Sequence, residues 1–172
     1  LALARRGLDI YGVDASMEML SVAQEKAAEE GVSILFLCQK MQTLDLYGTI
    51  NTVFCTLDSL NHLTGEEDVR KTFSRVALFL EPGGYFIFDM NTLYKHQYVL
   101  ANQAYLYETE DVFCAWQNHF EQKTGRVSIT LDFFEKRGKL YERSSERFFE
   151  RAYPLEAIVK WLKEAGLEPR LV

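Results

Sequence analysis

Hydrophobic positions in the first half of the chain follow two different periods. Short continuous apolar runs, typical of strands covered on both faces, alternate with amphipathic stretches that repeat every 3.6 residues. The predicted strands are 10–13, 33–38, 52–55 and 85–89, and the predicted helices are 16–30 and 64–81. Such a strand–helix–strand series predicts a mostly parallel sheet with helices on both faces, an α/β fold of the Rossmann-like, doubly wound kind.

Capping signals place the ends of the predicted helices. Ser16 fits the N-cap of the first helix, and Gly31 follows its last turn. Thr64 and Glu67 have the spacing of a capping box, in which a hydroxyl and a carboxylate satisfy the first backbone N–H groups. The apolar stripes that these helices are expected to bury comprise Leu20, Ala23 and Ala27 in the first and Val69, Phe73, Val76, Ala77 and Leu80 in the second.

The second half of the chain has a different pattern. From about residue 105 to residue 150 the apolar side chains alternate at period 2, and the glycine-containing segments 123–126 and 136–139 have the composition of hairpin turns. Two successive hairpins predict a three-stranded antiparallel sheet inserted into the α/β unit. Pro154 then suits the first position of a helix, and residues 167–172 are expected to begin one more strand.

The composition is that of a soluble globular protein with one domain of ordinary size. The 172 residues are 48% hydrophobic and 26% charged, and no apolar run approaches the roughly 20 residues that cross a bilayer. The formal net charge of -6 opposes the basic surface that a general nucleic-acid binder needs. A small-molecule partner is therefore expected, with neither nucleic acid nor a membrane.

The three cysteines are too few and too scattered for a disulfide framework or a zinc site. Cys38 and Cys55 lie in apolar runs, and we interpret them as reduced core residues of a cytoplasmic protein. The chain opens on residues 1–7, which resemble the last turns of a helix closed by Gly7. A further segment is therefore expected upstream.

Asp14 has the clearest chemical signal in the chain. It ends an apolar strand, and a helix begins directly after it, which places its carboxylate at the ligand-binding edge of an α/β sheet. An ionised carboxylate only accepts hydrogen bonds, so it suits the two hydroxyl donors of a ribose. The alternative is that Asp14 merely helps to cap the helix that follows.

Four segments carry a family resemblance when they are taken together: 10–16, the loop 39–41, 54–59, and the Leu-Glu-Pro-Gly-Gly-Tyr-Phe-Ile-Phe-Asp run at 80–89. Their order and spacing resemble the class I methyltransferases that use S-adenosylmethionine, in particular small bacterial enzymes with an antiparallel insertion. The resemblance covers about residues 1–95 and implies methyl transfer to a small-molecule acceptor by in-line displacement. It further implies a cofactor-binding α/β domain at 1–95 and 151–172, with 96–150 covering the substrate side.

The same resemblance assigns cofactor-binding roles to individual residues. Asp14 matches the acid that holds the ribose hydroxyls, and Ala15 and Met17 match positions that line the adenosine. Met17 has a plain core role as its alternative. Cys55 matches the strand-end position whose main chain approaches the methionine part of the cofactor.

Lys40 and Met41 fall where the family has an acid and an apolar residue beside the adenine. Lysine has no acceptor for the adenine amino group. That contact therefore passes to Gln39, a backbone carbonyl or water, or adenine recognition is weakened by about 1 kcal/mol, the ordinary worth of one hydrogen bond.

The family's first strand and Gly-rich loop would come before Leu1, and its closing pair of strands would come after Val172. Without that first strand, the strands ending at Asp14 and Cys55 would lack the neighbour that joins them. The numbered residues are therefore expected to be a fragment, or the ordered part, of a longer polypeptide.

Candidate catalytic residues follow the later strands. His62, Asp58 and Asn91 are the candidates for proton transfer, which is needed only if the acceptor must lose a proton. Each has a plainer alternative as a surface, capping or packing residue. Further polar candidates at the same edge are Asn61, Asp89 and Tyr94. No metal site is expected, because His96 and His119 stand without a carboxylate or cysteine at ligand spacing. The aromatic residues Tyr98, Tyr105, Tyr107 and Trp116 are expected to form the packed face of the inserted sheet, with an acceptor pocket as the alternative.

Two other functions stay open from the sequence alone. A nicotinamide-dependent oxidoreductase also places an acid after its second strand. A non-catalytic binding or dimerisation module is compatible with Lys40 and with the charged strand 141–150. A homodimer through the edge of the inserted sheet is compatible with the need to cover an exposed strand edge.

Overall fold

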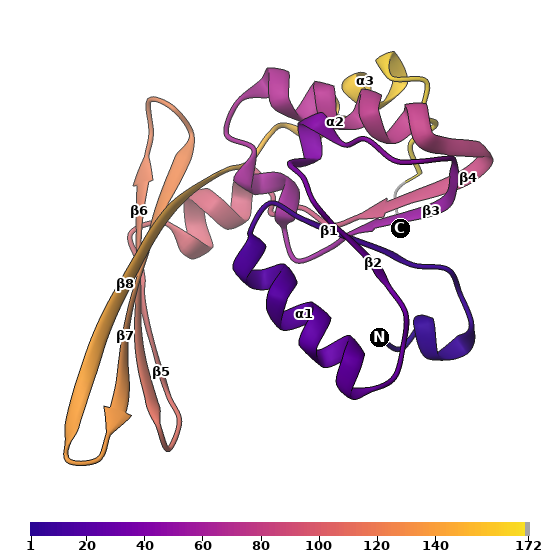
Figure 1. Cartoon of the computed structure of the whole chain (residues 1–172). Helices are drawn as coiled ribbons and strands as arrows, with labels where there is room; N and C mark the ends of the chain where they lie inside the picture. The colour runs from indigo at the N-terminus through magenta and orange to yellow at the C-terminus, as the bar shows by residue number, and fades with distance from the viewer. Residues whose placement is uncertain (171–172) are drawn as a thin grey trace.

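Parallel strands form two separate pairs in the computed structural model, which describes residues 1–170 (Figure 1). β1 (Tyr11–Asp14) pairs with β2 (Leu35–Cys38), and β3 (Ile50–Cys55) pairs with β4 (Leu80–Phe88). No ladder joins β1 to β3 within the described residues. This matches the expectation that these two strands lack a shared neighbour.

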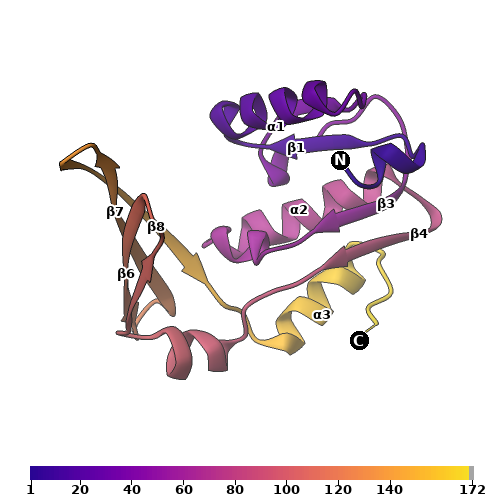
Figure 2. The ribbon, with the colours of Figure 1, turned by 90° about the horizontal axis from the view of Figure 1, so that it is seen from below.

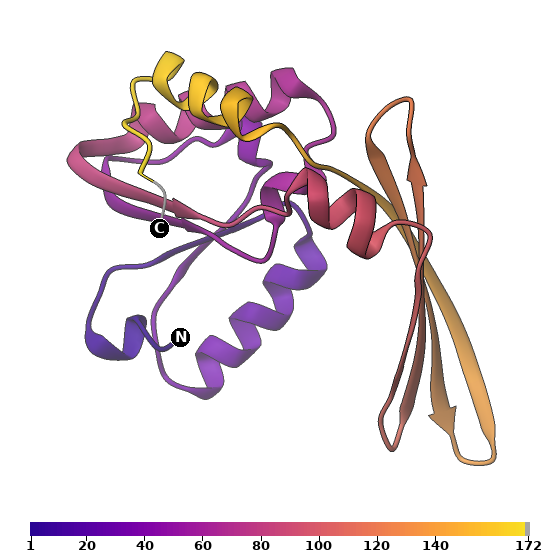
Figure 3. The same ribbon diagram turned by 180° about the vertical axis from the view of Figure 1, so that it is seen from behind.

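The helices cover the two sides of these strands unequally. α2 (Glu66–Phe79) and α3 (Leu155–Glu164) lie on one side of the β3–β4 pair, and α1 (Met17–Glu29) lies on the other (Figures 1 and 3). The core is therefore concentrated under α2 and α3. It comprises Leu60, Leu63, Val69, Phe73, Tyr153, Ile158, Trp161 and Leu162, with Phe86 and Phe88 of β4 packed against it. The uncovered face leaves Leu35 45% exposed, so the expectation that its strand is covered on both faces is wrong for the described chain.

Two of the predicted helix boundaries are confirmed and two are wrong. Ser16 caps α1 by accepting a hydrogen bond from the Met19 amide (3.1 Å), and Gly31 follows with a left-handed φ of 63°. α2 instead has Gly65 as its N-cap without a side-chain hydrogen bond, so the Thr64 capping box does not form. α2 also ends at Phe79, because the chain enters β4 directly.

The Pro-Gly-Gly segment lies inside β4 and explains its irregular pairing. Ile50 is opposite Leu80, but Thr52 is opposite Tyr85, so the residues between bulge out of the ladder. A Cβ on Gly84 would lie 2.5 Å from the carbonyl oxygen of Asn51. Only glycine allows the two strands to approach this closely.

The second half of the chain forms an antiparallel sheet that projects from the α/β unit (Figure 2). It has four strands, β5 (Ala104–Glu108), β6 (Val112–Glu121), β7 (Arg126–Arg137) and β8 (Leu140–Arg151), so the prediction of three was wrong. Both predicted hairpin turns are present, with Gly125 and Gly138 at positive φ. The missed strand, β5, is only five residues long, and no glycine marks its turn into β6.

Short helical turns connect these elements: η1 (Ala4–Arg6), η2 (Met41–Thr43), η3 (Ser59–His62) and the π-helical η4 (Lys95–Leu100). Gly7 closes η1 at φ 81°, as the opening residues indicate. Residues 167–170 form no strand, and the end of that predicted strand, 171–172, lies outside the described residues. None of the described helices is long and apolar enough to span a bilayer.

Candidate active site

The residues predicted to bind the cofactor gather along the carboxyl ends of β1, β2 and β3. The Gln39 amide donates to the main-chain oxygen of Asp14 (2.9 Å), which joins the 39–41 loop to the end of β1. Met41 in turn contacts Cys55, with 3.8 Å between the two sulfur atoms. A continuous chain of contacts therefore links Asp14, the loop and the end of β3.

Asp14 is exposed, and its carboxylate is only partly engaged. Oδ1 accepts a hydrogen bond from the Ser16 amide (2.8 Å), which is the helix-capping role weighed above. Within residues 1–170, Oδ2 accepts no hydrogen bond. One oxygen thus orders the start of α1 while the other stays available to a ligand.

The other predicted contacts differ in how accessible they are. Ala15 and Lys40 are exposed, and Met17 is 60% exposed, so its core alternative is wrong for the described chain. The Gln39 side-chain amide exchanges two hydrogen bonds with the main chain of Asp45 (2.8 and 2.9 Å) and so braces the loop. Cys55 is half-buried, whereas Cys38 is exposed, which corrects its interpretation as a core residue.

A cavity of about 240 Å³ lies where the carboxyl ends of β3 and β4 meet the antiparallel sheet. Its polar wall comes mainly from η3, the segment after β4, and the end of β8, and its apolar wall comes mainly from β6, β7 and β8. The lining residues are Asp58, His62, Asn91, Lys95, Leu100, Trp116, Ile129, Leu131, Phe148 and Glu150. The structure thus brings the three predicted catalytic candidates, His62, Asp58 and Asn91, into one cavity.

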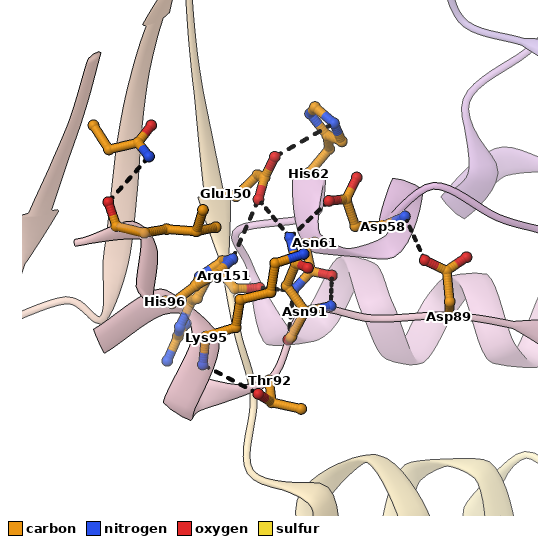
Figure 4. A network of polar contacts seen from close by, with 12 residues as sticks. Asp58, Asn61, His62, Asp89, Asn91, Thr92, Lys95, His96, Glu150 and Arg151 are labelled. Carbon is orange, nitrogen blue, oxygen red and sulfur yellow. Dashed lines mark hydrogen bonds and ion pairs between the residues drawn. The ribbon is translucent and has the colours of Figure 1, made fainter. Parts of the chain in front are cut away.

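Asn91 holds two carboxylates side by side in the polar wall (Figure 4). Its side-chain Nδ2 donates to Asp58 Oδ2 (2.6 Å) and to Glu150 Oε2 (3.3 Å). Glu150 is 4% exposed, and its other oxygen, Oε1, lies 3.9 Å from His62 Nε2. The His62 ring also packs on Phe148, with 5.1 Å between ring centroids.

His96 lies behind Glu150 and is completely buried. Its Nε2 is 3.2 Å from Glu150 Oε2, yet in the described part of the chain neither ring nitrogen has a hydrogen bond of acceptable geometry. His96 has no carboxylate at ligand spacing in the sequence, but β8 brings Glu150 to it in space from 54 positions further along the chain. His119 lies in a different cavity, with Glu121 and Arg126.

The backbone that presents Asp58 is strained. Leu57 and Asp58 both have positive φ, 57° and 49°, which is uncommon for residues other than glycine. Hydrogen bonds hold this conformation: the Asp58 amide donates to Asp89 Oδ2 (3.0 Å), and its carbonyl accepts from the Asn61 amide (2.7 Å). Strain held in this way is found at functional sites more often than elsewhere.

The two carboxylates have shifted pKa values in opposite directions. Burial, and then the charge of Glu150, raise the pKa of Asp58. Burial acts in the same sense on Glu150, but contact with His96, followed by the charges of His96 and His62, outweighs it and lowers the pKa of Glu150. The histidines thus favour the ionised form of Glu150, and burial favours the protonated form of Asp58.

These shifts predict opposite pH dependences for two isosteric variants. The raised pKa means that ionised Asp58 opposes folding, so its contribution is favourable at low pH and is lost as pH rises through the folded pKa. We therefore compare the unfolding free energy of Asp58→Asn with that of the unmodified chain at each pH. The difference, variant minus unmodified chain, is expected to increase from pH 4 to pH 7. Urea unfolding at the two pH values measures the difference.

Glu150 has the reverse sign. Its lowered pKa means that the ionised form stabilises the fold above the ordinary glutamate pKa, and that this contribution disappears as pH falls through the folded pKa. For Glu150→Gln, the difference in unfolding free energy, variant minus unmodified chain, is therefore expected to decrease from pH 4 to pH 7. A shift of both variants in the same direction would contradict the assigned charges.

Sequence reasoning missed Glu150, and for Trp116, which lines the cavity, it gave the acceptor pocket as the alternative to sheet packing. Glu150 is one of several charges on β8, and neighbours such as Glu142 and Glu146 are exposed. Its place at the return of β8 into the α/β unit distinguishes it, and the sequence marks that point only by the apolar Ala152 and Tyr153 that follow.

Comparison with known proteins identifies the family. A family model described as a methyltransferase domain matches residues 1–84. The chain is 32% identical over 169 residues to "Putative methyltransferase YqeM" of Bacillus subtilis (strain 168), covering 98% of this chain and 68% of that protein. The chain belongs to the methyltransferases.

Two further relatives support the membership of this methyltransferase family. "Putative methyltransferase GWCH70_2453" of Geobacillus sp. (strain WCH70) is 34% identical over 168 residues, covering 95% of this chain and 67% of that protein. The crystal structure of an S-adenosylmethionine-dependent methyltransferase from Clostridium acetobutylicum ATCC 824 superposes with a TM-score of 0.85 at 37% identity. That match covers 92% of this chain and 63% of the crystallised one, so the chain spans about two thirds of its relatives' length. The cofactor of this family is S-adenosylmethionine, and the oxidoreductase alternative is not favoured.

Proposed function

We propose that this methyltransferase chain binds S-adenosylmethionine along the carboxyl ends of β1–β3 and methylates a small molecule held in the adjoining cavity. Bound S-adenosylmethionine supplies a sulfonium-linked methyl group, which passes to a nucleophile by in-line displacement. The protein's part is to hold both reactants in line and to exclude water. Residues 1–95 with 151–170 form the cofactor-binding unit in this proposal, and 96–150 covers the acceptor.

The accessible side chains fit the cofactor. The free oxygen of Asp14 accepts the ribose hydroxyls, and Ala15 and Met17 at the start of α1 face the adenosine. Met41 lies on the other side of the adenine, with Lys40 on the solvent side of the same loop. The main chain at Cys55 approaches the methionine part. Because Gln39 is engaged with Asp45, a backbone carbonyl or water accepts from the adenine amino group.

The cavity suits a small acceptor with an apolar body and one polar end. Trp116, Leu131 and Phe148 offer an apolar wall, and the Asp58–Glu150 pair faces it. A volume of about 240 Å³ has room for roughly eight water molecules, which limits the acceptor to metabolite size. The reacting heteroatom points toward the polar wall, where an ionised carboxylate accepts its hydrogen.

The convergence of His62, Asp58, Asn91 and Glu150 on one cavity beside the cofactor edge carries this proposal. Calorimetric titration of the full-length protein with S-adenosylmethionine tests the first half. Release of S-adenosylhomocysteine in the presence of pooled small hydroxyl and amine metabolites tests the second half. Absence of cofactor binding at millimolar concentration would instead support a non-catalytic module.

Filling the cavity separates acceptor binding from cofactor binding. Leu131 is half-buried in the apolar wall, and the larger indole of Leu131→Trp is expected to occupy the acceptor's place. We expect the KM for the acceptor to rise about tenfold, the cost of roughly 1.4 kcal/mol of lost binding. The dissociation constant for S-adenosylmethionine should stay unchanged.

Leu140→Trp is the matched control, because Leu140 is 74% exposed at the far end of β8. It should alter neither constant. An unchanged acceptor KM in Leu131→Trp would place the acceptor outside this cavity.

A further inference from the structure

The polar wall of the cavity contains three groups whose ligand atoms lie close together. Asp58, His62 and Glu150 each offer one oxygen or nitrogen atom, and these atoms all lie within 4.8 Å of one another. We propose that they bind a divalent transition-metal cation. Two carboxylates and an imidazole form a mixed oxygen and nitrogen donor set that suits Zn²⁺ or Mn²⁺.

In the part of the chain that is described, each carboxylate of the cluster has one oxygen in a hydrogen bond and one without. Asn91 occupies Asp58 Oδ2 and Glu150 Oε2. Within residues 1–170, Asp58 Oδ1 and Glu150 Oε1 accept no hydrogen bond. One neutral amide thus orients both carboxylates, as outer groups orient metal ligands.

His96 gives an independent indication of a cation at this place. It is completely buried, its imidazole is directed at Glu150, and it has no hydrogen bond of acceptable geometry to any residue from 1 to 170. A buried polar group without a partner costs free energy, so such groups are rare in finished sites. A cation that draws Glu150 Oε1 toward itself turns Oε2 toward His96, which then donates to the ligating carboxylate.

Imidazoles are the ion-pair partners of this cluster within the described residues: Glu150 lies 3.2 Å from His96 Nε2 and 3.9 Å from His62 Nε2. Asp58 and Glu150 are neighbouring acids, and in the described part of the chain neither pairs with a lysine or arginine. Lys95 lines the same cavity but forms no ion pair with either of them there. An ion of charge +2 would balance both carboxylates.

The ligand atoms need to move only a short way to reach the distances that a bound metal ion requires. Ligand atoms around a tetrahedral ion with bonds of about 2.1 Å lie roughly 3.4 Å apart. The three ligand atoms here lie within 4.8 Å of one another, and His62 Nε2 and Glu150 Oε1 are 3.9 Å apart. The His62 side chain is 46% exposed on a short turn, so it can swing inward while the buried Glu150 stays fixed. If the proposed function holds, a bound ion would take the place of the direct carboxylate contact to the acceptor's heteroatom.

Titration of the metal-free full-length protein with Mn²⁺ and with Zn²⁺, without S-adenosylmethionine, tests the site. We expect one equivalent of either ion to bind with a micromolar dissociation constant, weakening as pH falls and protons compete for the ligands. Asp58→Ala and His62→Ala should each weaken binding at least tenfold. His119→Ala, the exposed histidine of the other cavity, is the matched control and should bind as the unmodified protein does.

His62→Ala keeps the experiment interpretable, because an exposed side chain is removed and circular dichroism can verify the fold. Absence of binding at millimolar metal, or binding that is indifferent to His62→Ala, overturns the proposal. Binding of ethylammonium in place of the metals would likewise overturn it and identify the pair of acids as an amine site. A separate S-adenosylmethionine titration of His62→Ala shows whether the cofactor site is intact, so failure of either proposal is recognised by itself.

Discussion

Replacing Asn61 by alanine is expected to lower the free energy of unfolding by about 3 kcal/mol, since each buried polar group left unsatisfied costs about 1–3 kcal/mol. The Asn61 side chain is completely buried. Its Nδ2 donates to the carbonyl oxygens of Asn91 (3.2 Å) and Arg151 (3.0 Å), and its Oδ1 accepts from the Asn91 amide (2.8 Å). Alanine would leave three main-chain groups without partners.

The functional consequence follows from the three elements that Asn61 joins. It links η3 to the segment after β4 and to the end of β8, which are the sources of Asp58, Asn91 and Glu150 (Figure 4). Loosening this junction separates the two carboxylates. We therefore expect the variant to lose acceptor turnover while its affinity for S-adenosylmethionine, bound at the other strand ends, is retained.

Urea unfolding measures the loss of stability, with Asn51→Ala as the control because Asn51 is exposed. The control should change the free energy by less than about 0.5 kcal/mol, as ordinary surface substitutions do. A loss below about 1 kcal/mol in Asn61→Ala would mean that water replaces the asparagine and that the junction is not fixed by this residue.

The α/β part of the fold could be predicted because its signals are local. Ser16 and Gly31 mark the ends of α1, and period-3.6 spacing marks α2, whose Val69 and Phe73 are buried as expected. The predicted ends of α2 were wrong because the path of the chain in three dimensions, and not the local sequence, sets them. Thr64 has the right spacing for a capping box, yet the chain enters α2 one residue later.

The candidate site was predictable only in part, because it depends on contacts between distant residues. His62, Asp58 and Asn91 follow strand ends, and parallel strands bring their carboxyl ends to one edge, so their convergence could be anticipated. Glu150 and His96 meet only because β8 returns to the α/β unit after a four-stranded excursion. No periodicity in either segment encodes that return.

Replacing Asp14 by alanine is expected to weaken S-adenosylmethionine binding by roughly 30- to 150-fold, the equivalent of about 2–3 kcal/mol for charge-assisted hydrogen bonds to a ribose. The carboxylate is exposed at the end of β1, and its Oδ2 is free of hydrogen bonds within the described chain. The fold should suffer little, because the substitution removes only the bond to the Ser16 amide, and Ser16 still caps α1. Calorimetric titration of the full-length protein measures the dissociation constant.

Asp9→Ala is the matched control for this substitution. It removes the same charge from a position two residues before β1, where Asp9 is also exposed, so any general effect of net charge appears in both variants. Equal affinities in the two variants would mean that Asp14 serves only the turn into α1. A loss confined to Asp14→Ala would place the ribose at the carboxyl end of β1, because only there can one carboxylate order the helix with one oxygen and hold a nucleoside with the other.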